Sequence, residues 1–532
     1  MQSALPAIFV HSHNQRPHNF SGIRKNPNDF FDFSYYYINK EYISLQTEEE
    51  MKKLEADVAV VAVGLSGLAA AVAAAECGKS VIALEKTATT GGAANMGMGP
   101  LGIDTKQQRD ELCTITLEKA FKMFMDYTHW RVDAQLVRKY FEKSASTIEW
   151  LEDMGVEFYK AAKYFPECQN TWHIVKPESG EPGPRAAATM IKRMTEHAAE
   201  LGVQILYETP ATGILKEDGR VCGVRGMGKD GEEVEVRAKA VIVATGGFGD
   251  NVQLIKEKTG YECGKDYFGF QIPGLKGDGI RMALEAGAAT TDVSVEMAAS
   301  LPGDLTPTVF AAFAQPNLMV NLLGERFFNE EQAENSTFLG NAVNIQKDRC
   351  GVMVFDNTAK KRYIKHGVDV LSLVRNVKNI DSFDEDLDAA LAAGEKYVFK
   401  ADSLEELADM AGINKEKFLE TVEQYNDYCD TRDEQFDKSA KYMRPIRKAP
   451  FYAAKYFPGA YGTLGGIKIN HMTEVIDTEF TPIPGLYAAG TDTCTIYGDS
   501  YMFLLPGNTM GYCLNTGRMA GENCSDYIDS LE

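Results

Sequence analysis

Long apolar runs, paired cysteines and an excess of basic charge are all missing from this sequence of 532 residues. No apolar stretch approaches the roughly 20 residues that span a bilayer. The ten cysteines are dispersed without a CxxC or CxxCH pattern, which excludes a zinc ribbon, a local iron–sulfur cluster and a c-type haem attachment. Scattered thiols of this kind are typical of the reducing cytoplasm, where we expect the protein.

Basic residues are outnumbered, since 76 acidic residues stand against 55 basic ones and the formal charge is −21. Nucleic-acid backbones are bound through clustered lysines and arginines, so this balance argues against a nucleic-acid partner. The content of 44% hydrophobic and 25% charged residues is typical of a globular protein, and the length predicts two or three domains.

Residues 1–50 show no sustained periodicity and are rich in Asn, Phe, Tyr and His. The opening MQSALPAIFVHSHNQ lacks the basic region and the apolar core of a secretory signal. At Met51 the pattern changes to MKKLEADVAVVAVG, which is typical of a natural protein start. We expect residues 1–50 to be translated leader from a misplaced start; the alternative is an arm that packs on the first domain.

A strand–turn–helix–strand unit occupies residues 57–85. The apolar run DVAVVAV leads through Gly64-Leu65-Ser66-Gly67 into the small-residue helix LAAAVAAAECG, and a second apolar run ends in Glu85. Glycines let the backbone approach a pyrophosphate, the helix N-terminus faces the phosphate charge, and the carboxylate accepts from a ribose hydroxyl. One glycine of the GxGxxG pattern is replaced by Ala62, which is tolerable if its φ stays negative.

Further strands and Gly-rich turns follow, and the stretch between about 297 and 461 changes to charged helices and aromatic loops. This change predicts a second domain inserted between two halves of the first. The predicted parts are residues 1–50 (N-terminal segment), 51–296 (first half of the nucleotide-binding domain), 297–461 (capping domain) and 462–532 (second half).

Taken in order, the blocks resemble the fumarate reductase/succinate dehydrogenase flavoprotein superfamily, which includes soluble fumarate and urocanate reductases and 3-ketosteroid dehydrogenases. The resemblance covers roughly residues 55–530 and is carried by VAVGLSGLAAAVAAAECGKSVIALEK, TTGGAANMG, VIVATGGFG, GDGIRMALEAGA, GERFFNE, GTLGGIKIN and PIPGLYAAG. It implies an α/β fold with a Rossmann-like FAD-binding domain of the glutathione-reductase type and an inserted α+β capping domain. It also implies non-covalent FAD, because the histidine that carries covalent flavin has no counterpart in TTGGAANMGMG.

The resemblance places FAD contacts along the whole chain. The implied contacts are Gly64, Leu65, Ser66 and Gly67 at the pyrophosphate, Glu85 and Lys86 near the adenosine ribose, Thr90, Gly91, Gly92 and Ala94 along the flavin, Ala211 at the adenine with Gly246, Gly490 and Asp492 nearby, and Asn508, Thr509 and Met510 at the pyrimidine edge. A helix that starts at this edge stabilises negative charge on the reduced flavin.

The carboxylate clamps of fumarate-type members are missing here. Their histidines and arginines align with Met297-Ala298-Ala299, with Tyr461-Gly462 and with Leu504. A small dicarboxylate substrate is therefore disfavoured. The segments APFYAAKYFPGAYGTLGG and GDSYMFLLPGNTMG are instead similar to the 3-ketosteroid dehydrogenase side of the superfamily.

In that branch a tyrosine hydroxyl and a glycine amide hold the substrate carbonyl, which polarises it for hydride transfer. Gly507 matches the glycine. Tyr501 matches the tyrosine if two residues are inserted here, whereas an alignment without a gap gives Phe503; Tyr501 as a packed loop aromatic is the alternative.

Glu334 is the candidate proton-moving group. Four residues after the Glu of the Asn329-Glu330 pair, fumarate reductases carry an acid arginine and ketosteroid dehydrogenases a base tyrosine; here the count gives Glu334. A carboxyl in an apolar pocket has a raised pKa and can act in either direction. The alternative is that Glu334 faces water within the acidic run EEQAEN.

We therefore expect an FAD-dependent oxidoreductase that acts on a CH–CH or C=C bond next to a carbonyl, with an apolar small-molecule substrate such as a 3-oxo steroid or a bile-acid-like enone. Two alternatives stay open: a reductase of a small unsaturated carboxylic acid, and an electron-transfer subunit of a larger complex. Electrons would enter from, or leave to, NAD(P)H, free flavin or a redox protein. No metal site is expected.

Overall fold

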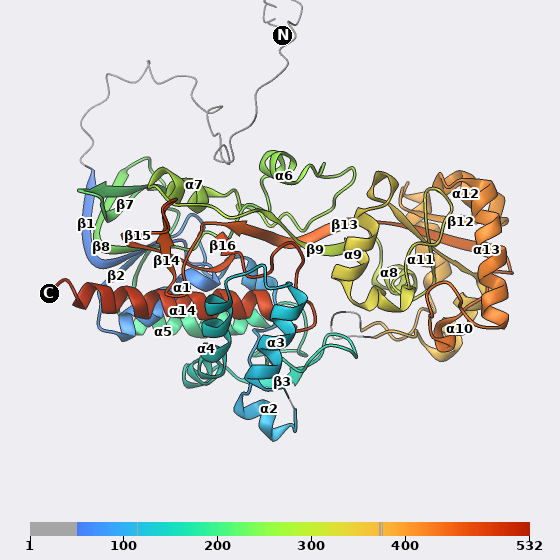
Figure 1. The fold of residues 1–532 in the computed structure, drawn as a ribbon, viewed down its shortest axis with the longest axis horizontal. Coiled ribbons are helices and arrows are strands. Elements are labelled where there is room, and N and C mark those ends of the chain that lie inside the picture. Colours follow the sequence, from blue (N-terminus) through green and yellow to red (C-terminus); the bar gives the residue numbers. More distant parts are fainter. Residues whose placement is uncertain (1–50, 114, 372–373, 375) are drawn as a thin grey trace, which may run out of the picture. The chain divides into compact units, whose positions relative to one another are not determined.

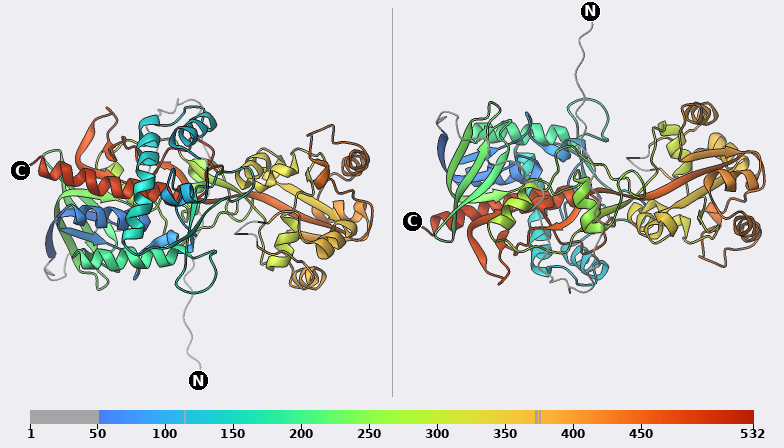
Figure 2. Two further views of the ribbon diagram at one scale, coloured as in Figure 1. Left: turned by 90° about the horizontal axis from the view of Figure 1, so that it is seen from below. Right: turned by 90° about the horizontal axis from the view of Figure 1, so that it is seen from above.

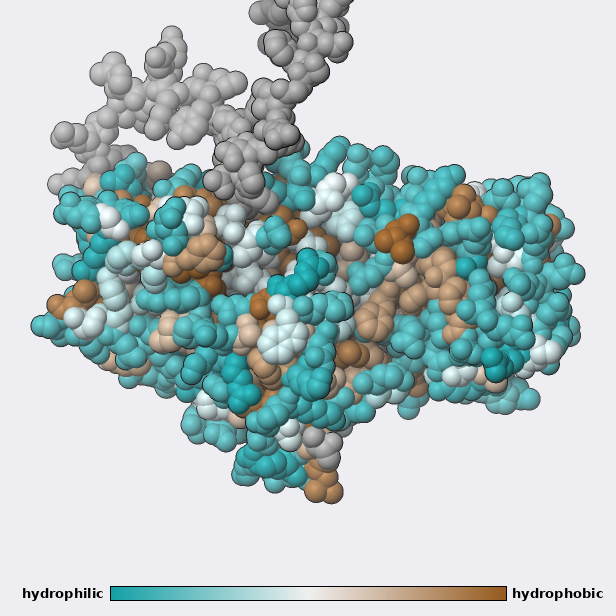
Figure 3. Space-filling view, viewed as in Figure 1, coloured by the Kyte–Doolittle hydropathy of each residue, from teal (hydrophilic) through white to brown (hydrophobic). Residues whose placement is uncertain are grey.

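The computed structural model describes residues 51–113, 115–371, 374 and 376–532, all of which belong to one compact unit, Glu48–Glu532. The expected leader, residues 1–50, lies outside the described residues. None of the described helices is long and apolar enough to cross a membrane. The face seen in Figure 3 is mostly hydrophilic, in keeping with a chain in which 25% of residues are charged.

An eight-stranded sheet carries the predicted nucleotide-binding domain and takes strands from both of its predicted halves (Figure 1). Its order is β14-β15-β8-β1-β2-β5, with β7 also paired to β8 and β6 to β7. Strands β5, β2, β1, β8 and β15 are parallel. The fully buried apolar run of β2 is typical of a central strand covered on both faces. The bounds are β1 (Lys52–Val61), β2 (Val81–Leu84), β5 (Gln204–Leu206), β6 (Ala211–Glu217), β7 (Arg220–Met227), β8 (Glu233–Val243), β14 (Glu474–Ile476) and β15 (Pro482–Ala488).

Three helices pack together on one side of this sheet: α1 (Leu65–Glu76), α5 (Ala187–Glu200) and α14 (Asn508–Asp529) (Figures 1 and 2). α1 consists largely of alanine and is buried over its first ten residues. Small side chains allow the close approach of α1 and α14: a Cβ on Gly517 would lie 2.2 Å from the Ser66 carbonyl oxygen, and one on Gly521 would lie 2.4 Å from that of Ala70. The middle of α14 therefore packs on the first turns of α1.

A second, six-stranded sheet forms the capping domain, with the order β10-β11-β13-β12 and with β9 and β16 also paired to β13. Two apolar cores flank it, one centred on Phe313, Phe355 and Tyr452 and one on Phe418 and Tyr425. The bounds are β9 (Ser294–Ser300), α8 (Pro307–Phe313), β10 (Leu318–Asn321), η3 (Glu330–Glu334), α9 (Ser336–Asn344), η4 (Lys347–Arg349), β11 (Gly351–Asp356), α10 (Asn357–His366), α11 (Phe383–Ala392), β12 (Val398–Ala401), α12 (Leu404–Ala411), α13 (Lys415–Asp430), η5 (Ala440–Tyr442), β13 (Phe451–Gly466) and β16 (Thr493–Cys494).

The two predicted boundaries of the capping domain, 296/297 and 461/462, fall inside strands and not in loops. β9 contains the first and β13 the second, and the two strands pair antiparallel from Ser300↔Phe457 to Ser294↔Leu464. The register shifts between Ala460 and Thr463, at the second boundary. A paired ribbon with a bulge thus joins the capping domain to the first half of the chain.

The remaining elements surround the first sheet. They are η2 (Gly92–Met96), α2 (Lys106–Asp110), α3 (Leu117–Tyr127), α4 (Ala134–Asp153), β3 (Phe158–Ala162), β4 (Trp172–Val175), α6 (Val252–Thr259), α7 (Asp278–Glu285) and η6 (Gly490–Asp492). β3 and β4 form a hairpin that hydrogen-bonds to the segment 98–102, so that it lies close to the start of α14.

Candidate active site

The turn after β1 holds the first of the expected cofactor contacts. α1 begins at Leu65 with Gly64 as its N-cap, and no described side chain caps its first turn. The backbone N–H groups at the start of α1 can therefore bind an anion. A Cβ on Gly67 would lie 1.9 Å from the carbonyl oxygen of Ala62, so glycine is needed for α1 to pack on the turn.

Ala62 corrects one detail of the sequence analysis, which required a negative φ at this position. Its φ is +71°, in the left-handed region. A non-glycine residue there is strained by roughly 1–2 kcal/mol. The Ala62 N–H donates to the Leu84 carbonyl at 2.8 Å, which ties the residue to β2. The alanine that replaces the first glycine of the pattern thus adopts a glycine-like conformation.

Glu85 and Lys86, the expected ribose contacts, lie at the end of β2. The buried Glu85 carboxylate accepts from the Val63 N–H at 2.9 Å and from the Thr87 N–H at 2.8 Å, so it fixes the turn between β1 and α1. The Lys86 ammonium donates to Asp278 at 2.9 Å and also to the Gly274 carbonyl. Lys86 therefore joins β2 to the start of α7.

The Gly-rich loop packs on the same turn. Gly91 forms a bridge with Gly64, and its N–H donates to the Val63 carbonyl at 2.8 Å. The Thr90 hydroxyl shares a hydrogen bond of 2.8 Å with the Thr195 hydroxyl of α5. Gly92 and Ala94 follow in η2. The expected flavin-side contacts thus lie beside the expected pyrophosphate contacts.

Asp492 connects two turns at the carboxyl ends of β8 and β15. Its buried carboxylate accepts from the Gly247 N–H at 2.8 Å and from the Thr245 hydroxyl at 2.9 Å, and burial raises its pKa. Gly490 begins η6, and its N–H donates to Thr516 of α14 at 3.0 Å. The two other expected contacts of this group also lie at the sheet: Gly246 follows β8 and Ala211 begins β6.

No described side chain caps the first turn of α14. Gly507 is its N-cap with φ +82°, and a Cβ there would lie 2.7 Å from the Leu101 backbone nitrogen. Asn508 is fully buried, and its Oδ1 accepts from the hydroxyls of Tyr140 at 3.0 Å and Tyr497 at 2.9 Å. Its Nδ2 has no hydrogen-bond partner among the described residues. A buried donor of this kind calls for an acceptor.

Thr509 connects Tyr501 with a buried carboxyl that the sequence analysis did not single out, that of Glu296. The Thr509 Oγ1 lies 2.8 Å from Glu296 Oε1 and 3.0 Å from the Tyr501 hydroxyl, which also accepts from the Thr509 N–H at 3.4 Å. Burial raises the pKa of Glu296 to about 7, although the Thr509 hydrogen bond lowers it. The only signal in the sequence was one glutamate within the apolar strand SVEMAAS.

Glu334 lies at the end of η3 and is partly buried. The next three residues attach this segment to β9. Asn335 caps α9, the Ser336 Oγ accepts from the Ala299 N–H at 3.0 Å, and the Thr337 hydroxyl donates to the Met297 carbonyl at 2.8 Å. Glu334 and Glu296 thus belong to segments that are hydrogen-bonded neighbours.

The motif that precedes Glu334 forms a buried ion cluster of Arg326, Glu330, Asp433 and Lys438. The Arg326 guanidinium donates to Glu330 at 2.8 and 2.9 Å and to Asp433 at 2.7 and 2.9 Å. Lys438 Nζ lies 3.2 Å from Glu330. Glu330 also accepts from the Met319 N–H of β10 at 3.0 Å. The GERFFNE block therefore anchors η3 to the capping sheet.

Aromatic rings lie at or next to two of the positions that align with the carboxylate clamps, Tyr461 and Leu504. The rings of Phe270, Tyr461, Phe503 and Phe165 are stacked in sequence, with interplanar angles of 16°, 11° and 4°. Phe503 also contacts Tyr501, with ring centroids 5.6 Å apart. We call these four residues the aromatic row. It brings flat apolar surfaces close to Tyr501.

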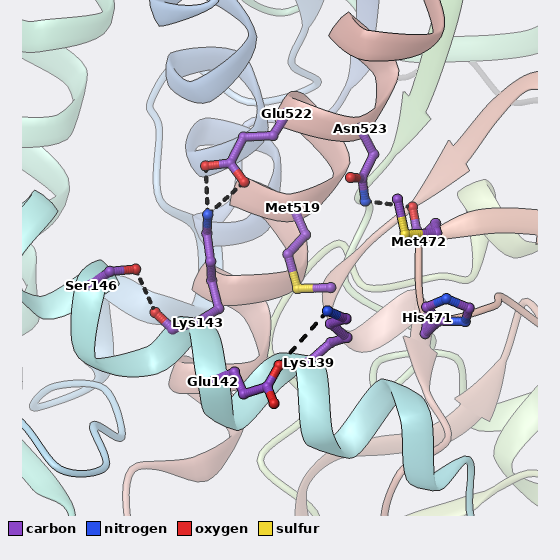
Figure 4. A pocket seen from close by; sticks show the side chains of 9 residues that line it. All are labelled: Lys139, Glu142, Lys143, Ser146, His471, Met472, Met519, Glu522 and Asn523. Atoms are coloured by element: carbon purple, nitrogen blue, oxygen red, sulfur yellow. Dashed lines mark hydrogen bonds and ion pairs between the residues drawn. The ribbon is translucent and has the colours of Figure 1, made fainter. Parts of the chain in front are cut away.

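A separate cavity of about 310 Å³ lies between α4, α14 and the turn at His471 (Figure 4). Its Lys143 pairs with Glu522 at 2.6 Å, and its Lys139 lies 3.8 Å from Glu142. Met519, which lines it, is eleven residues after Asn508, or about 16 Å along the helix. This cavity contains none of the expected site residues.

A family model described as an FAD binding domain matches residues 57–509 of the chain. The chain belongs to this family. FAD is its cofactor, the α/β fold with an FAD-binding domain and a cap is confirmed, and the chain is an FAD-dependent oxidoreductase that acts on CH–CH or C=C bonds.

Relatives in this FAD-binding family include a vinyl phenol reductase of Lactiplantibacillus plantarum, which is 32% identical over 88% of this chain and 96% of its own length. A fumarate reductase (cytochrome) of Shewanella frigidimarina is 28% identical over 88% of this chain and 77% of its own length. Among solved structures, a 3-ketosteroid-delta4-(5alpha)-dehydrogenase of Rhodococcus jostii RHA1 matches with a TM-score of 0.71 at 24% identity, over 90% of this chain and 98% of that one. This last likeness concerns the fold.

The described residues fit FAD. The uncapped start of α1 suits a pyrophosphate, because helix N-termini favour negative charge. The unpaired Nδ2 of Asn508 at the start of α14 suits a carbonyl at the pyrimidine edge of the flavin. The two helix starts that the resemblance assigns to the two ends of the cofactor therefore have the donors it needs.

Proposed function

We propose that this oxidoreductase reduces a C=C bond conjugated to a flat hydroxyaryl ring, that is, an alkenyl phenol. The observation that carries the proposal is the aromatic row beside Tyr501, where fumarate-type members are expected to hold carboxylates. A flat ring with one oxygen suits stacked aromatic side chains and a single hydroxyl donor. The 32% identity to a vinyl phenol reductase supports the same substrate class.

A dicarboxylate fits these residues poorly. Met297, Ala298, Tyr461 and Leu504 occupy the aligned clamp positions and carry no charge. Buried carboxylates require paired cations or several hydrogen bonds. The enone expected from the sequence is the second candidate, because it also offers one oxygen to Tyr501.

The proposed reaction adds a hydride to one carbon of the C=C bond and a proton to its neighbour. FAD, when bound, supplies the hydride. Glu334 gives the proton, and its position on η3 is held by the buried ion cluster. The substrate phenol releases its O–H proton to solvent as Glu334 protonates the terminal carbon, and hydride addition to the benzylic carbon then leaves a phenolate, which takes up a proton on release. The Tyr501 hydroxyl and the Gly507 N–H bind this oxygen while it gains negative charge. Electrons come from an external donor: NAD(P)H, free flavin or a redox protein.

A substrate screen tests the proposal. The FAD-loaded protein with reduced viologen should reduce 4-vinylphenol with a kcat/KM at least ~10-fold above that for fumarate, since the fumarate clamp is missing. A 3-oxo-4-ene steroid and acrylate are the other substrates to compare. Preference for the steroid would favour the second candidate, and preference for fumarate or acrylate would overturn the proposal.

The Glu334→Gln variant tests the proton donor. We expect turnover to fall at least ~100-fold, the usual scale for loss of a general acid, with the flavin absorbance retained. Glu325→Gln, in the same motif but exposed, is the matched control and should keep its turnover. Turnover of Glu334→Gln within ~3-fold of the wild type would remove Glu334 from the mechanism.

A further inference from the structure

We propose that Glu296 is a positioning residue whose protonation state sets the direction of a hydrogen-bond chain, Glu296–Thr509–Tyr501, and so decides whether the Tyr501 hydroxyl can donate to the substrate oxygen. The inference rests on the proposed function, because it concerns the group that binds that oxygen. The chain is formed by hydrogen bonds of 2.8 and 3.0 Å that meet at the single hydroxyl of Thr509.

Proton counting gives the chain two directions. Thr509 has one hydroxyl proton and can donate it to only one of its two neighbours. When Glu296 is ionised, Thr509 donates to the carboxylate, and Tyr501 donates its proton to Thr509 Oγ1. Tyr501 then has no proton for the substrate, while its oxygen accepts from the Thr509 N–H.

When Glu296 is protonated, every bond in the chain reverses. The carboxyl donates to Thr509 Oγ1, and the Thr509 hydroxyl donates to the Tyr501 oxygen. The Tyr501 O–H is then directed away from Thr509 and can donate to a substrate oxygen that gains charge. The neutral form of Glu296 is therefore the active one.

The surroundings of Glu296 keep this equilibrium near neutral pH. Burial raises its pKa to about 7, and no described cation acts on it. Burial also raises the pKa of the neighbouring titratable groups far enough that they stay neutral there: Tyr267 before α7, Cys494 of β16, Tyr497 and Tyr501 before α14, and Cys513 of α14. The adjacent elements also carry Tyr461 on β13 and Glu334 on η3.

The site is built closely around this carboxyl. A Cβ on Gly462 would lie 3.1 Å from Glu296 Oε2, so the β13 backbone covers the second carboxylate oxygen. Glu296 precedes Met297, whose carbonyl accepts from Thr337 of α9. These contacts hold the carboxyl against Thr509, with only 1% of Glu296 exposed.

The first test is independent of substrate. In holoprotein labelled with ¹⁵N-threonine, the Thr509 amide, assigned through its loss in Thr509→Ser, should titrate with a midpoint near pH 7. The Glu296→Gln variant should abolish this titration, because the amide of Gln donates to Thr509 at every pH. Glu334→Gln should leave it in place. A Thr509 amide that does not titrate in the wild type would overturn the proposal.

The second test is the pH profile. Because Glu334 is itself the proposed proton donor, the profile is measured in Glu334→Gln, where kcat/KM for the best substrate should still fall ~10-fold per pH unit above pH 7. Adding Glu296→Gln should shrink the fall between pH 7 and 8.5 to less than ~2-fold. Glu423→Gln, on the exposed face of α13, should keep both the profile and the basal activity.

Thr509→Val, added to Glu334→Gln, removes the oxygen that takes the Tyr501 proton when Glu296 is ionised. Tyr501 then keeps its proton for the substrate at every pH, so the profile should also be flat. An unchanged alkaline fall in Glu296→Gln or Thr509→Val would contradict the proposal. A Thr509 titration in a protein that reduces neither alkenyl phenols nor enones would instead overturn the proposed function alone.

Discussion

Two glutamates are almost equally inaccessible to water, Glu330 in the capping domain with 0% exposure and Glu296 on β9 with 1% exposure, yet their acidities move in opposite directions. Burial alone would raise the pKa of Glu330, but Lys438 and Arg326 outweigh it, and the pKa is lowered. Glu296 has one hydroxyl partner and no described cation, so burial raises its pKa to about 7. Nearby cations and hydrogen-bond donors, and not the extent of burial alone, decide whether a buried carboxyl is ionised.

The opposite pKa shifts of Glu330 and Glu296 agree with a structural role for the first and a role in the candidate active site for the second. The buried ion cluster holds the GERFFNE segment in one conformation, because each of its carboxylates is fixed by several donors. The Glu296 carboxyl instead accepts from the Thr509 hydroxyl beside Tyr501, and no described cation acts on it. A pKa close to physiological pH at a buried position is typical of functional sites.

Removing a cation from the buried ion cluster of the capping domain should have the largest effect on stability. Arg326→Met leaves Glu330 and Asp433 buried with a single cation between them, and we expect a loss of about 3–5 kcal/mol in unfolding free energy. Urea unfolding of the holoprotein measures it. Arg432→Met is the control, since Arg432 forms an exposed pair with Asp437 at 3.6 Å.

A double variant sharpens this prediction. Arg326→Met/Asp433→Asn removes one charge of each sign, so it should be more stable than Arg326→Met by at least ~1 kcal/mol. The Asn side chain can still accept from the Lys438 N–H, which donates to Asp433 at 3.0 Å. A double variant as unstable as the single one would mean that Arg326 acts through packing, for example on Phe436, and not through charge.

The same contrast explains what could be predicted from the sequence. Strands, Gly-rich turns and helix starts are encoded locally, so the α/β class and the family followed from short motifs such as DVAVVAVGLSG. Glu296 was missed because its environment is not local. Thr509 is 213 positions away, and Gly462, which lies against the carboxyl, is brought there by the pairing of β9 with β13. Ala62 was misjudged because its φ depends on how closely α1 packs.

Stability should depend on pH through Glu296. Its pKa is about 7 in the folded protein, above the ordinary 4.5, so its contribution is fully present below pH 4.5 and is lost as the pH rises through 7. Relative to Glu296→Gln, the wild type should lose about 2.5 kcal/mol between pH 5 and pH 8. Thermal unfolding at both pH values measures it, with Glu423→Gln as control. Parallel curves for the two proteins would show that Glu296 is ionised without cost.

His173 offers the converse case, a buried base without a compensating charge. Its Nε2 lies 2.8 Å from the Thr105 hydroxyl and its Nδ1 lies 3.1 Å from the Thr171 carbonyl. Burial lowers its pKa from 6.5 to about 4, although the Thr171 carbonyl raises it. The neutral ring therefore stabilises the fold above pH 6.5, and this contribution is lost as the pH falls towards 4.

We expect this to be the smallest of the effects, about 2 kcal/mol between pH 6.5 and pH 5 relative to His173→Gln. The exposed His366→Gln is the matched control and should follow the wild type. If His173→Gln keeps the acid sensitivity of the wild type, the ring is already charged in the folded protein. The surroundings of His173 would then stabilise its charged form, as the buried ion cluster does for Glu330. Glu296 would be the only one of the three groups whose charged form is disfavoured by its surroundings.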